Sequence, residues 1–332
     1  MQREKVVPRL LDALAWRRER VLLPARRWLS FRGSEGSIRW RWPWPLKKPW
    51  QRAHLRLVSH GGGIGDELMC TPIFREIRRR NPDCHITFLS RYPEIFRSNP
   101  HVNVVERFSL SAVADATYLQ YNLMVPPPRP LVTLMAECVG LVLPPSRLVP
   151  PVVEPSPALQ DRFARIPAPR IVIQPQASQW TPNKQWPVEM WRQLIEKLVE
   201  SYDVIEVGTQ PLFAGVDFGP RFHSVSGATT MSDFAWAVSQ ATVFVGPPSG
   251  GMHLANAYEI PSVIILGGYE APDGYDYPWV QRFFTPVECA PCWLTTPCPY
   301  ELKCLRAIQP TEVFRAVVKA VPSTVSASLS VV

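Results

Sequence analysis

The sequence predicts an α/β protein built from two similar units, each with a parallel sheet. Short runs rich in Val, Ile and Leu alternate along the chain with segments of helical periodicity, which is typical of parallel sheets. Proline-rich stretches divide this alternation into two series. The length of 332 residues suits about two domains of ordinary size.

The first series predicts a unit over residues 53–150. Its elements are strands at residues 55–60, 85–90 and 102–106, a glycine loop with a helix at 61–80, and a helix at 131–142. We expect Thr71 to cap its helix. Prolines then gather between residues 125 and 158, and residues 151–168 are predicted to be a linker.

The second series predicts a unit over residues 169–322. Its elements are strands at residues 170–176, 203–208, 242–245 and 262–266, and helices at 187–201, 231–241 and 310–321. A short helix is expected between the last two strands. We expect Thr311 to cap the last helix, and residues 323–332 to form a disordered tail.

Residues 1–52 form a separate basic extension. They hold 14 Lys and Arg against 4 Asp and Glu, whereas the remaining 280 residues hold 22 against 24. Because the folded body is not basic, the sequence argues against a nucleic-acid-binding protein. Four tryptophans lie among Arg and Lys at residues 40–50, which suits an anionic membrane surface. The alternative is an arm that packs on its own protein.

No membrane-spanning segment is predicted. The longest apolar stretch, residues 131–143, contains Glu137 and is shorter than the roughly 18 residues that cross a bilayer. The first residues carry scattered charges and do not resemble a signal peptide. Seven cysteines are few for a secreted scaffold, so the sequence favours a cytoplasmic protein and leaves peripheral contact with the inner membrane open.

The loop GGGIGD at residues 61–66 is the first candidate site. Its last position is not the glycine of a dinucleotide-binding loop but Asp66, whose carboxylate would repel a pyrophosphate. At the carboxyl edge of a sheet, Asp66 could accept a proton from a substrate hydroxyl. The alternative is that Asp66 caps the helix that follows.

The loop at residues 174–187 is the second candidate. It follows a predicted strand and offers Ser178 and Lys184 at the edge of the sheet. A lysine there could neutralise a phosphate, and the alternative is an ordinary solvated lysine.

The stretch PPSGGMH at residues 247–253 is a candidate phosphate loop. Ser249 could cap a helix, and Gly250 and Gly251 would let an anion approach the free N–H groups at the helix start. His253 lies one turn further on, within reach of that anion.

A cysteine cluster lies near the carboxyl terminus. Cys289, Cys292, Cys298 and Cys304 follow the spacing C-x2-C-x5-C-x5-C. Four thiols this close predict a structural zinc or iron site away from the reaction centre. A redox pair and unpaired thiols are the alternatives.

Taken in order and spacing, four motifs resemble glycosyltransferase family 9, the ADP-heptose:lipopolysaccharide heptosyltransferases. The resemblance covers about residues 55–321. The matching motifs are G-x-G-D at residues 63–66, K-x-W-P at 184–187, S-G-x-x-H-L-A at 249–255, and the four late cysteines.

The resemblance implies a GT-B architecture, in which two Rossmann-like domains face each other across a cleft. It also implies inverting transfer of a heptose-like sugar from a nucleotide-diphospho-sugar, such as ADP-heptose, to a lipopolysaccharide-type or related lipid-linked glycan. No metal or cofactor would act at the reaction centre.

The resemblance assigns roles to individual residues. Asp66 would be the general base that acts on the acceptor hydroxyl. Ser178, Lys184 and the amides of residues 249–251 would hold the diphosphate, and His253 would lie near the phosphate or the sugar.

Two positions depart from the family pattern on the donor side. Pro248 stands where the family has an acidic residue, and Gln210 lies where an acidic donor contact is expected. Two alternatives therefore stay open. One is a transferase with another donor sugar or a protein acceptor, and the other is a catalytically degenerate glycan-binding protein.

Overall fold

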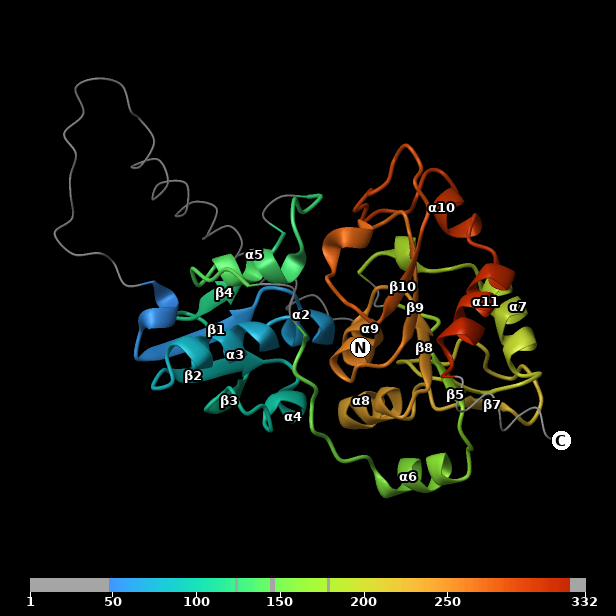
Figure 1. Ribbon diagram of the computed structural model, residues 1–332, viewed down its shortest axis with the longest axis horizontal. Helices are drawn as coiled ribbons and strands as arrows, with labels where there is room; N and C mark the ends of the chain where they lie inside the picture. Colours follow the sequence, from blue (N-terminus) through green and yellow to red (C-terminus); the bar gives the residue numbers. More distant parts are fainter. Residues whose placement is uncertain (1–47, 123–124, 144–146, 178–179, 323–332) are drawn as a thin grey trace.

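The structure is a computed structural model that describes residues 48–122, 125–143, 147–177 and 180–322. Two α/β units lie side by side, the first in blue to green and the second in yellow-green to red (Figure 1). Each contains one parallel sheet, with strand orders β3-β2-β1-β4 and β10-β9-β8-β5-β6-β7. The predicted α/β class with two parallel sheets is therefore confirmed.

The first sheet has its topological switch point between β1 and β4. Its strands are β1 (His54–Ser59), β2 (His85–Ser90), β3 (Val104–Arg107) and β4 (Thr117–Leu119). The chain moves outward from β1 to β3 and then returns to the other side of β1. In such sheets, ligands bind beyond the carboxyl ends of the two strands that flank the switch point.

Short helices accompany the first sheet. They are α2 (Ile64–Leu68), α3 (Thr71–Arg80), α4 (Pro93–Phe96) and α5 (Leu131–Glu137), with the 3-10 turn η1 (Pro49–Gln51) before β1. In α3, Ile73, Phe74 and Ile77 recur at helical spacing and are fully buried. Thr71 is not its cap, because Cys70 holds that position and the Thr71 hydroxyl donates to the Leu68 carbonyl.

The second sheet repeats the same arrangement with six strands. They are β5 (Arg170–Ile173), β6 (Asp203–Glu206), β7 (Phe222–Ser224), β8 (Val243–Gly246), β9 (Ser262–Gly267) and β10 (Val280–Phe284). The chain moves outward from β5 to β7 and returns to the other side of β5 at β8. The second switch point therefore lies between β5 and β8.

Helices and turns of the second unit cover its sheet. They are α6 (Pro157–Ala164), η2 (Pro182–Lys184), α7 (Val188–Leu198), α8 (Met231–Ser239), α9 (Gly250–Ala257), η3 (Pro272–Gly274), α10 (Lys303–Arg306) and α11 (Pro310–Ala320). Trp191 of α7 and Val313 of α11 are fully buried in one apolar core with Ile171. The cap of α11 is Gln309, so the expectation for Thr311 is wrong.

The two units share buried apolar contacts. One core cluster includes Leu57 and Phe74 of the first unit and Phe244 and Leu254 of the second. Helices α2 and α9 meet in the middle of the molecule, between the two sheets (Figure 1).

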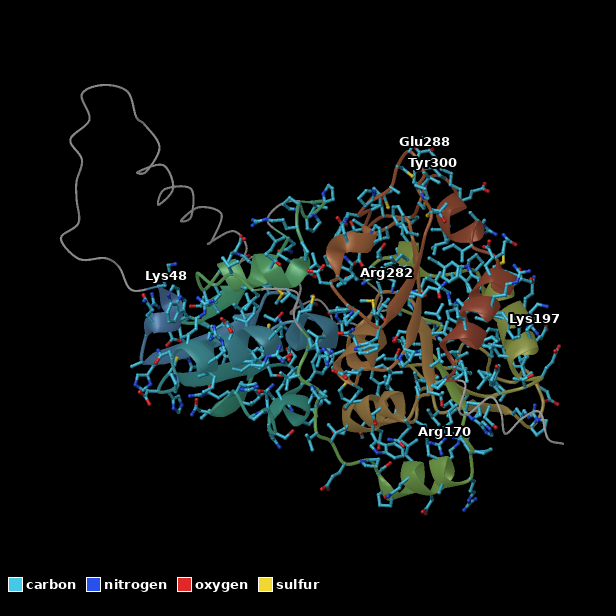
Figure 2. The ribbon with its side chains drawn as sticks, in the orientation of Figure 1. Lys48, Arg170, Lys197, Arg282, Glu288 and Tyr300 are labelled. Carbon is cyan, nitrogen blue, oxygen red and sulfur yellow. The ribbon has the colours of Figure 1, made fainter. Side chains whose placement is uncertain are left out.

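The segment predicted to be a linker contains α6. The Arg170 guanidinium, labelled in Figure 2, fixes this helix to β5 by donating to the carbonyls of Phe163 and Ile166. Most of the basic extension, residues 1–47, and the predicted tail lie outside the described residues. Across the described part of the chain, no helix is long and apolar enough to cross a membrane.

Candidate active site between the two units

Asp66 lies at the first switch point. The loop after β1 carries it on α2, and Tyr121 comes just after β4 on the other side. The Tyr121 hydroxyl donates to Asp66 Oδ1 at 2.8 Å, and the Gly63 N–H donates to Oδ2 at 3.1 Å. Asp66 is the N3 residue of α2 and Gly63 is the N-cap, so the alternative that Asp66 caps a following helix is wrong. Its carboxylate bonds back to the helix start and also faces the end of the neighbouring strand.

The position of the Asp66 side chain requires a glycine at residue 61. A Cβ on Gly61 would lie 2.1 Å from Asp66 Cγ, so the carboxylate occupies the space of a side chain. The loop is held from outside by Arg91 and Tyr92, whose side chains donate to the carbonyls of Gly61 and Gly62. The loop therefore presents one carboxylate in a fixed place.

Tyr121 was not predicted from the sequence as a site residue. Burial, followed by the nearby Asp66 carboxylate, raises the pKa of Tyr121 well above its ordinary value, so the phenol keeps its proton and donates. The signal that could have found it is its place at the carboxyl end of β4, a strand of only three residues.

Glu67 is a second carboxylate beside Asp66, on the buried side of α2. It is fully buried and accepts from the Ser90 hydroxyl at 2.5 Å and from the Arg91 N–H at 2.8 Å. Burial raises the pKa of Glu67 to about 7, although both hydrogen bonds oppose the shift. Glu67 thus ties α2 to the end of β2.

We expect Glu67 to make stability depend on pH. Its raised pKa means that the folded chain keeps a proton that the unfolded chain releases near its ordinary value of 4.5. Stability should therefore fall as the pH rises through this interval, by on the order of 3 kcal/mol relative to Glu67→Gln. Urea unfolding at pH 5 and pH 8 measures this difference. The exposed Asp83→Asn is the control, and an equal gap between wild type and Glu67→Gln at both pH values would contradict the expectation.

The second switch point joins Gln174 to the loop before α9. Gln174 follows β5, and its Oε1 accepts from the Ser249 hydroxyl at 2.9 Å and from the Gly251 N–H at 3.1 Å. Ser249 holds the N-cap position of α9, as predicted, but its side chain bonds to Gln174 and makes no hydrogen bond to the helix. A Cβ on Gly251 would lie 2.3 Å from Gln174 Oε1, so the close approach needs a glycine. Gln174 was not predicted as a site residue, although it is the first residue of the loop 174–187.

Lys184 is not an ordinary solvated lysine. It ends η2, and its side chain is only 14% exposed. Its Nζ lies 2.5 Å from Glu270 Oε1 and 3.4 Å from the Pro248 carbonyl oxygen. The neighbouring Asn183 amide donates to the carbonyls of Leu294 and Thr296, which fixes the turn that presents this cation.

His253 lies where the two units meet. Its Nδ1 is 2.6 Å from the Tyr277 hydroxyl, and a Cβ on Gly65 would lie 2.4 Å from its Cδ2. Burial, with a smaller contribution from Lys184, lowers the pKa of His253 to about 3. The ring is therefore neutral near pH 7, and it would meet a phosphate as a hydrogen-bonding group rather than as a cation.

The two glycine motifs fit against each other. The ring of His253 packs on Gly65, and Ile64 packs on Gly250, where an added Cβ would lie 2.3 Å from Ile64 Cγ2. Helices α2 and α9, which start at the two switch points, thus bring the Asp66 loop and the Ser249 loop together.

Residues 121–279 match the family model described as glycosyltransferase family 9 (heptosyltransferase). This part of the chain is similar to that family. The match contains the motifs at residues 184–187 and 249–255, whereas Asp66 precedes it. No curated protein matches the chain in sequence.

Several solved structures share the fold of this chain. Escherichia coli ADP-heptose lipopolysaccharide heptosyltransferase II is 17% identical, with a TM-score of 0.60 over 80% of this chain and 98% of that one. The iron-containing dodecameric glycosyltransferase TibC from enterotoxigenic E. coli is 20% identical, with a TM-score of 0.62 over 80% and 78%. E. coli heptosyltransferase WaaC, solved with ADP, is 13% identical, with a TM-score of 0.54 over 80% and 99%. The expected GT-B architecture is thereby confirmed.

The structure does not test two of the predicted donor contacts. Ser178 lies outside the described residues. Gln210 is exposed and follows β6, one strand away from the switch point between β5 and β8. Its role in binding stays a prediction.

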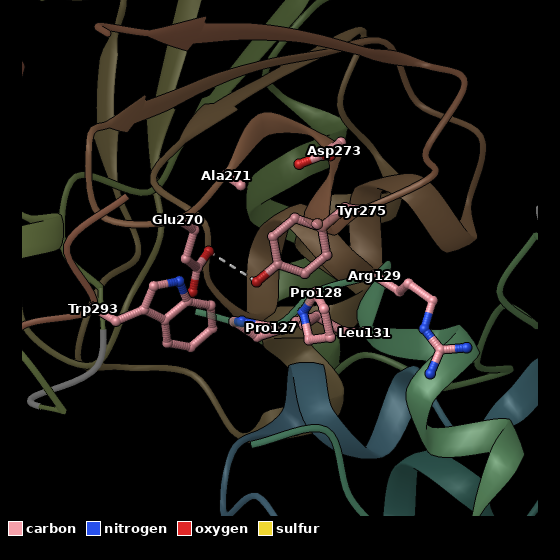
Figure 3. Close-up of a pocket in the computed structure, with 10 residues that line it drawn as sticks. Pro127, Pro128, Arg129, Leu131, Glu270, Ala271, Asp273, Tyr275 and Trp293 are labelled. Carbon is pink, nitrogen blue, oxygen red and sulfur yellow. Dashed lines mark hydrogen bonds between the residues drawn. The ribbon is translucent and has the colours of Figure 1, made fainter. Parts of the chain in front are cut away.

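A pocket at the boundary of the units is lined by Glu270, the ion-pair partner of Lys184 (Figure 3). The first unit lines it with the segment around Arg129, and the second with Glu270, Asp273, Tyr275 and Trp293. Arg282, labelled in Figure 2, supports this wall by donating to the carbonyls of Tyr275 and Tyr277.

The four late cysteines are free thiols, and in the sequence they stand on both sides of Trp293, which lines the pocket. Burial raises the pKa of Cys304, and the nearby Cys292 and Cys298 thiols raise it further. Within the described residues, no three side chains of metal-binding type are arranged to hold an ion. The metal site stays a prediction.

Proposed function

We propose that the protein is an inverting glycosyltransferase that moves a heptose-like sugar from a nucleotide-diphospho-sugar to a lipopolysaccharide-type or related glycan. The observation that carries the proposal is the meeting of two switch points. Asp66 stands at one, and Lys184 with the start of α9 stands at the other, while Gly65 packs directly on His253. Transfer between two bound substrates requires a base near the acceptor and a diphosphate site for the donor, held opposite each other.

In the proposed reaction, Asp66 acts as general base. Its carboxylate accepts the proton of the acceptor hydroxyl as that oxygen forms a bond to the anomeric carbon, opposite the leaving group. The bond from the anomeric carbon to the diphosphate oxygen breaks, and the diphosphate leaves with the electron pair. Tyr121 and the Gly63 amide keep the carboxylate aimed through their hydrogen bonds.

The donor diphosphate would meet fixed positive groups. Lys184 supplies a full charge, and the positive end of the α9 dipole supplies a partial charge. Both stabilise the negative charge as it grows on the leaving group. ADP as the nucleotide is supported by the fold relatives, since WaaC has been solved with ADP and TibC with ADP-D-β-D-heptose. Chemistry of this kind needs no metal at the reaction centre.

A panel of nucleotide-sugars tests the proposal. Purified protein is given ADP-D-β-D-heptose, GDP-mannose or UDP-glucose with a lipopolysaccharide core acceptor, and released nucleoside diphosphate is measured. We expect release that depends on the acceptor with one of these donors. If the protein binds a glycan yet releases no nucleotide from any donor, it is the degenerate binding protein that Pro248 suggests.

A lipid-linked acceptor would explain the basic extension. We propose that residues 1–52 bring a cytoplasmic enzyme to the inner membrane, because cations and tryptophans together suit an anionic lipid surface. The full chain should sediment with vesicles that contain phosphatidylglycerol, and not with phosphatidylcholine vesicles. A chain without residues 1–52 that sediments equally well would show that the extension has another role.

The cysteine cluster is proposed to hold a structural zinc or iron ion. Thiols are soft donors that these metals accept, and TibC is described as iron-containing. We expect elemental analysis to find about one such ion per chain. Cys289→Ser with Cys292→Ser should lose it, while Cys138→Ser, outside the cluster, should keep it. A metal-free wild type would leave unpaired thiols or a redox pair.

A further inference from the structure

We propose that a groove beside α6 binds the phosphate group of a soluble small molecule, held by Arg162 and Arg165. The groove lies between α6 and β7, near the amino ends of the strands of the second sheet. The candidate active site lies at the opposite, carboxyl ends of these parallel strands. The proposal therefore concerns a second site and does not depend on the proposed function.

The sheet lines the groove with His223 of β7. Its Nε2 lies 2.9 Å from Asp203 Oδ1, and the two side chains are 23% and 16% exposed. The register places Ile205 of β6 opposite His223, and Asp203 lies two residues before Ile205, so both polar side chains are on one face of the sheet. Asp203 therefore already has a partner, and it opposes an anion less than an unpaired carboxylate would.

Helix α6 lines the opposite side of the groove with two arginines. Leu159 and Phe163 are buried against the core, whereas Arg162 and Arg165 are exposed. Side chains three positions apart are neighbours on a helix, with about 5–6 Å between their Cβ atoms. In the part of the chain that the structure describes, neither guanidinium forms an ion pair or a hydrogen bond. Two neighbouring cations thus face the groove with their donors unused.

The helix that carries these arginines is held at both ends. The Arg170 guanidinium donates to two carbonyls near the end of α6 and fixes it to β5. At the start of the helix, the Ser156 N–H donates to Asp233 Oδ1 of α8 at 2.6 Å. The walls of the groove are therefore in place before a ligand arrives, which lowers the cost of ordering on binding.

The size and charge of the groove favour a phosphate-bearing molecule. Its volume is about 620 Å³, within the range of small-molecule sites. One guanidinium binds two oxygens of a carboxylate or a phosphate, but only the phosphate keeps a further oxygen for the second arginine. Asp161 also lines the groove, and because it is exposed its carboxylate can turn to water. Arg162 and Arg165 together outweigh it by one charge.

The test uses sodium pyrophosphate as the probe and the ring signals of His223 in the full chain as the reporter, read by NMR. The signals are assigned by their loss in His223→Gln. In the wild type they should shift and reach saturation as pyrophosphate is added. Arg162→Gln combined with Arg165→Gln should weaken this binding at least about tenfold, because both charged donors are lost.

Two control variants separate this groove from other cations. Arg315→Gln combined with Lys319→Gln removes two exposed cations from α11 and should leave the His223 shift unchanged. Lys184→Gln should also leave it unchanged, because Lys184 lies at the carboxyl ends of the strands. A shift of His223 that persists in the double arginine variant, or that sodium chloride reproduces at equal ionic strength, would overturn the proposal.

A lipid surface is the other source of phosphate that the test distinguishes. If vesicles with phosphatidic acid broaden the His223 signals while pyrophosphate leaves them unchanged, the groove faces a membrane and the soluble ligand is wrong. Since both arginines are exposed, the double variant should melt near the wild-type temperature. If it does not fold, Arg165→Gln alone decides, because weaker pyrophosphate binding supports the proposal and unchanged binding contradicts it.

Discussion

Asp66→Asn should abolish sugar transfer while the chain stays folded. Loss of a general base lowers turnover by about 10²- to 10⁴-fold, because the acceptor hydroxyl must then lose its proton without help. The amide has the same shape, so one of the two hydrogen bonds from Gly63 and Tyr121 can persist. The loss of the other should cost about 1 kcal/mol of stability.

The measurement is acceptor-dependent release of nucleoside diphosphate at saturating donor, with a thermal melt of each variant. Asp83→Asn is the matched control, since it removes an exposed carboxylate from the same unit. The affinity for ADP should be unchanged in Asp66→Asn, because the donor site lies in the other unit. If Asp66→Asn keeps more than about a tenth of wild-type turnover, Asp66 is not the base and only holds the start of α2 through its bond with Gly63.

Most elements of the fold could be predicted because they carry their own periodic signal. The strand at residues 85–90 was predicted with its observed limits, and the helices α7, α8 and α11 within a few residues. Strands β4, β7 and β10 were missed. The first two have three residues each, and all three are only partly buried, so no long apolar run marks them.

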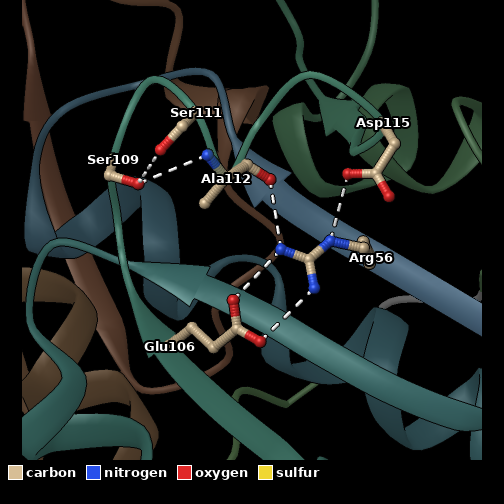
Figure 4. A network of polar contacts seen from close by, with 6 residues as sticks. All are labelled: Arg56, Glu106, Ser109, Ser111, Ala112 and Asp115. Atoms are coloured by element: carbon tan, nitrogen blue, oxygen red, sulfur yellow. Dashed lines mark hydrogen bonds and ion pairs between the residues drawn. The ribbon is translucent and has the colours of Figure 1, made fainter.

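The residues before β4 show why short elements escape a sequence pattern. Arg56 on β1 pairs with Glu106 on β3, and with Asp115 and the Ala112 carbonyl in the segment that leads to β4 (Figure 4). These partners are 50 to 59 residues from Arg56 in the chain. Such a network fixes a loop through tertiary contacts, and no local sequence pattern indicates it.

The residues of the candidate site, too, could be predicted only in part. The Asp66, Lys184 and Ser249 loops could be found because glycines, prolines and a charge stand at strand ends. Tyr121 and Gln174 could not, since each acts through a partner that is distant in the sequence. Which strands lie next to each other decides these pairs, and the sequence does not give the strand order directly.

Gly65→Ala should move the Asp66 loop away from the phosphate site at the start of α9. A Cβ at this position would lie 2.4 Å from Cδ2 and 2.8 Å from Nε2 of His253, a ring that is itself packed against Tyr277. Overpacking of this kind costs about 1–3 kcal/mol, and here it acts on the contact that joins α2 to α9. Because the base and the phosphate site lie on opposite sides of that contact, we expect turnover to fall at least about 100-fold, more than the loss of stability alone would give.

The control for Gly65→Ala lies in the same loop. A Cβ on Gly62 would have no atom closer than 3.9 Å, so Gly62→Ala should keep near-normal stability and turnover. The double variant Gly65→Ala with His253→Ala should regain part of the lost unfolding midpoint, because the obstructing ring is gone. Turnover should not return with it, since the packing that sets the distance between the two sheets is also gone. If Gly65→Ala is as active as Gly62→Ala, the contact between the loops does not position the two halves of the site.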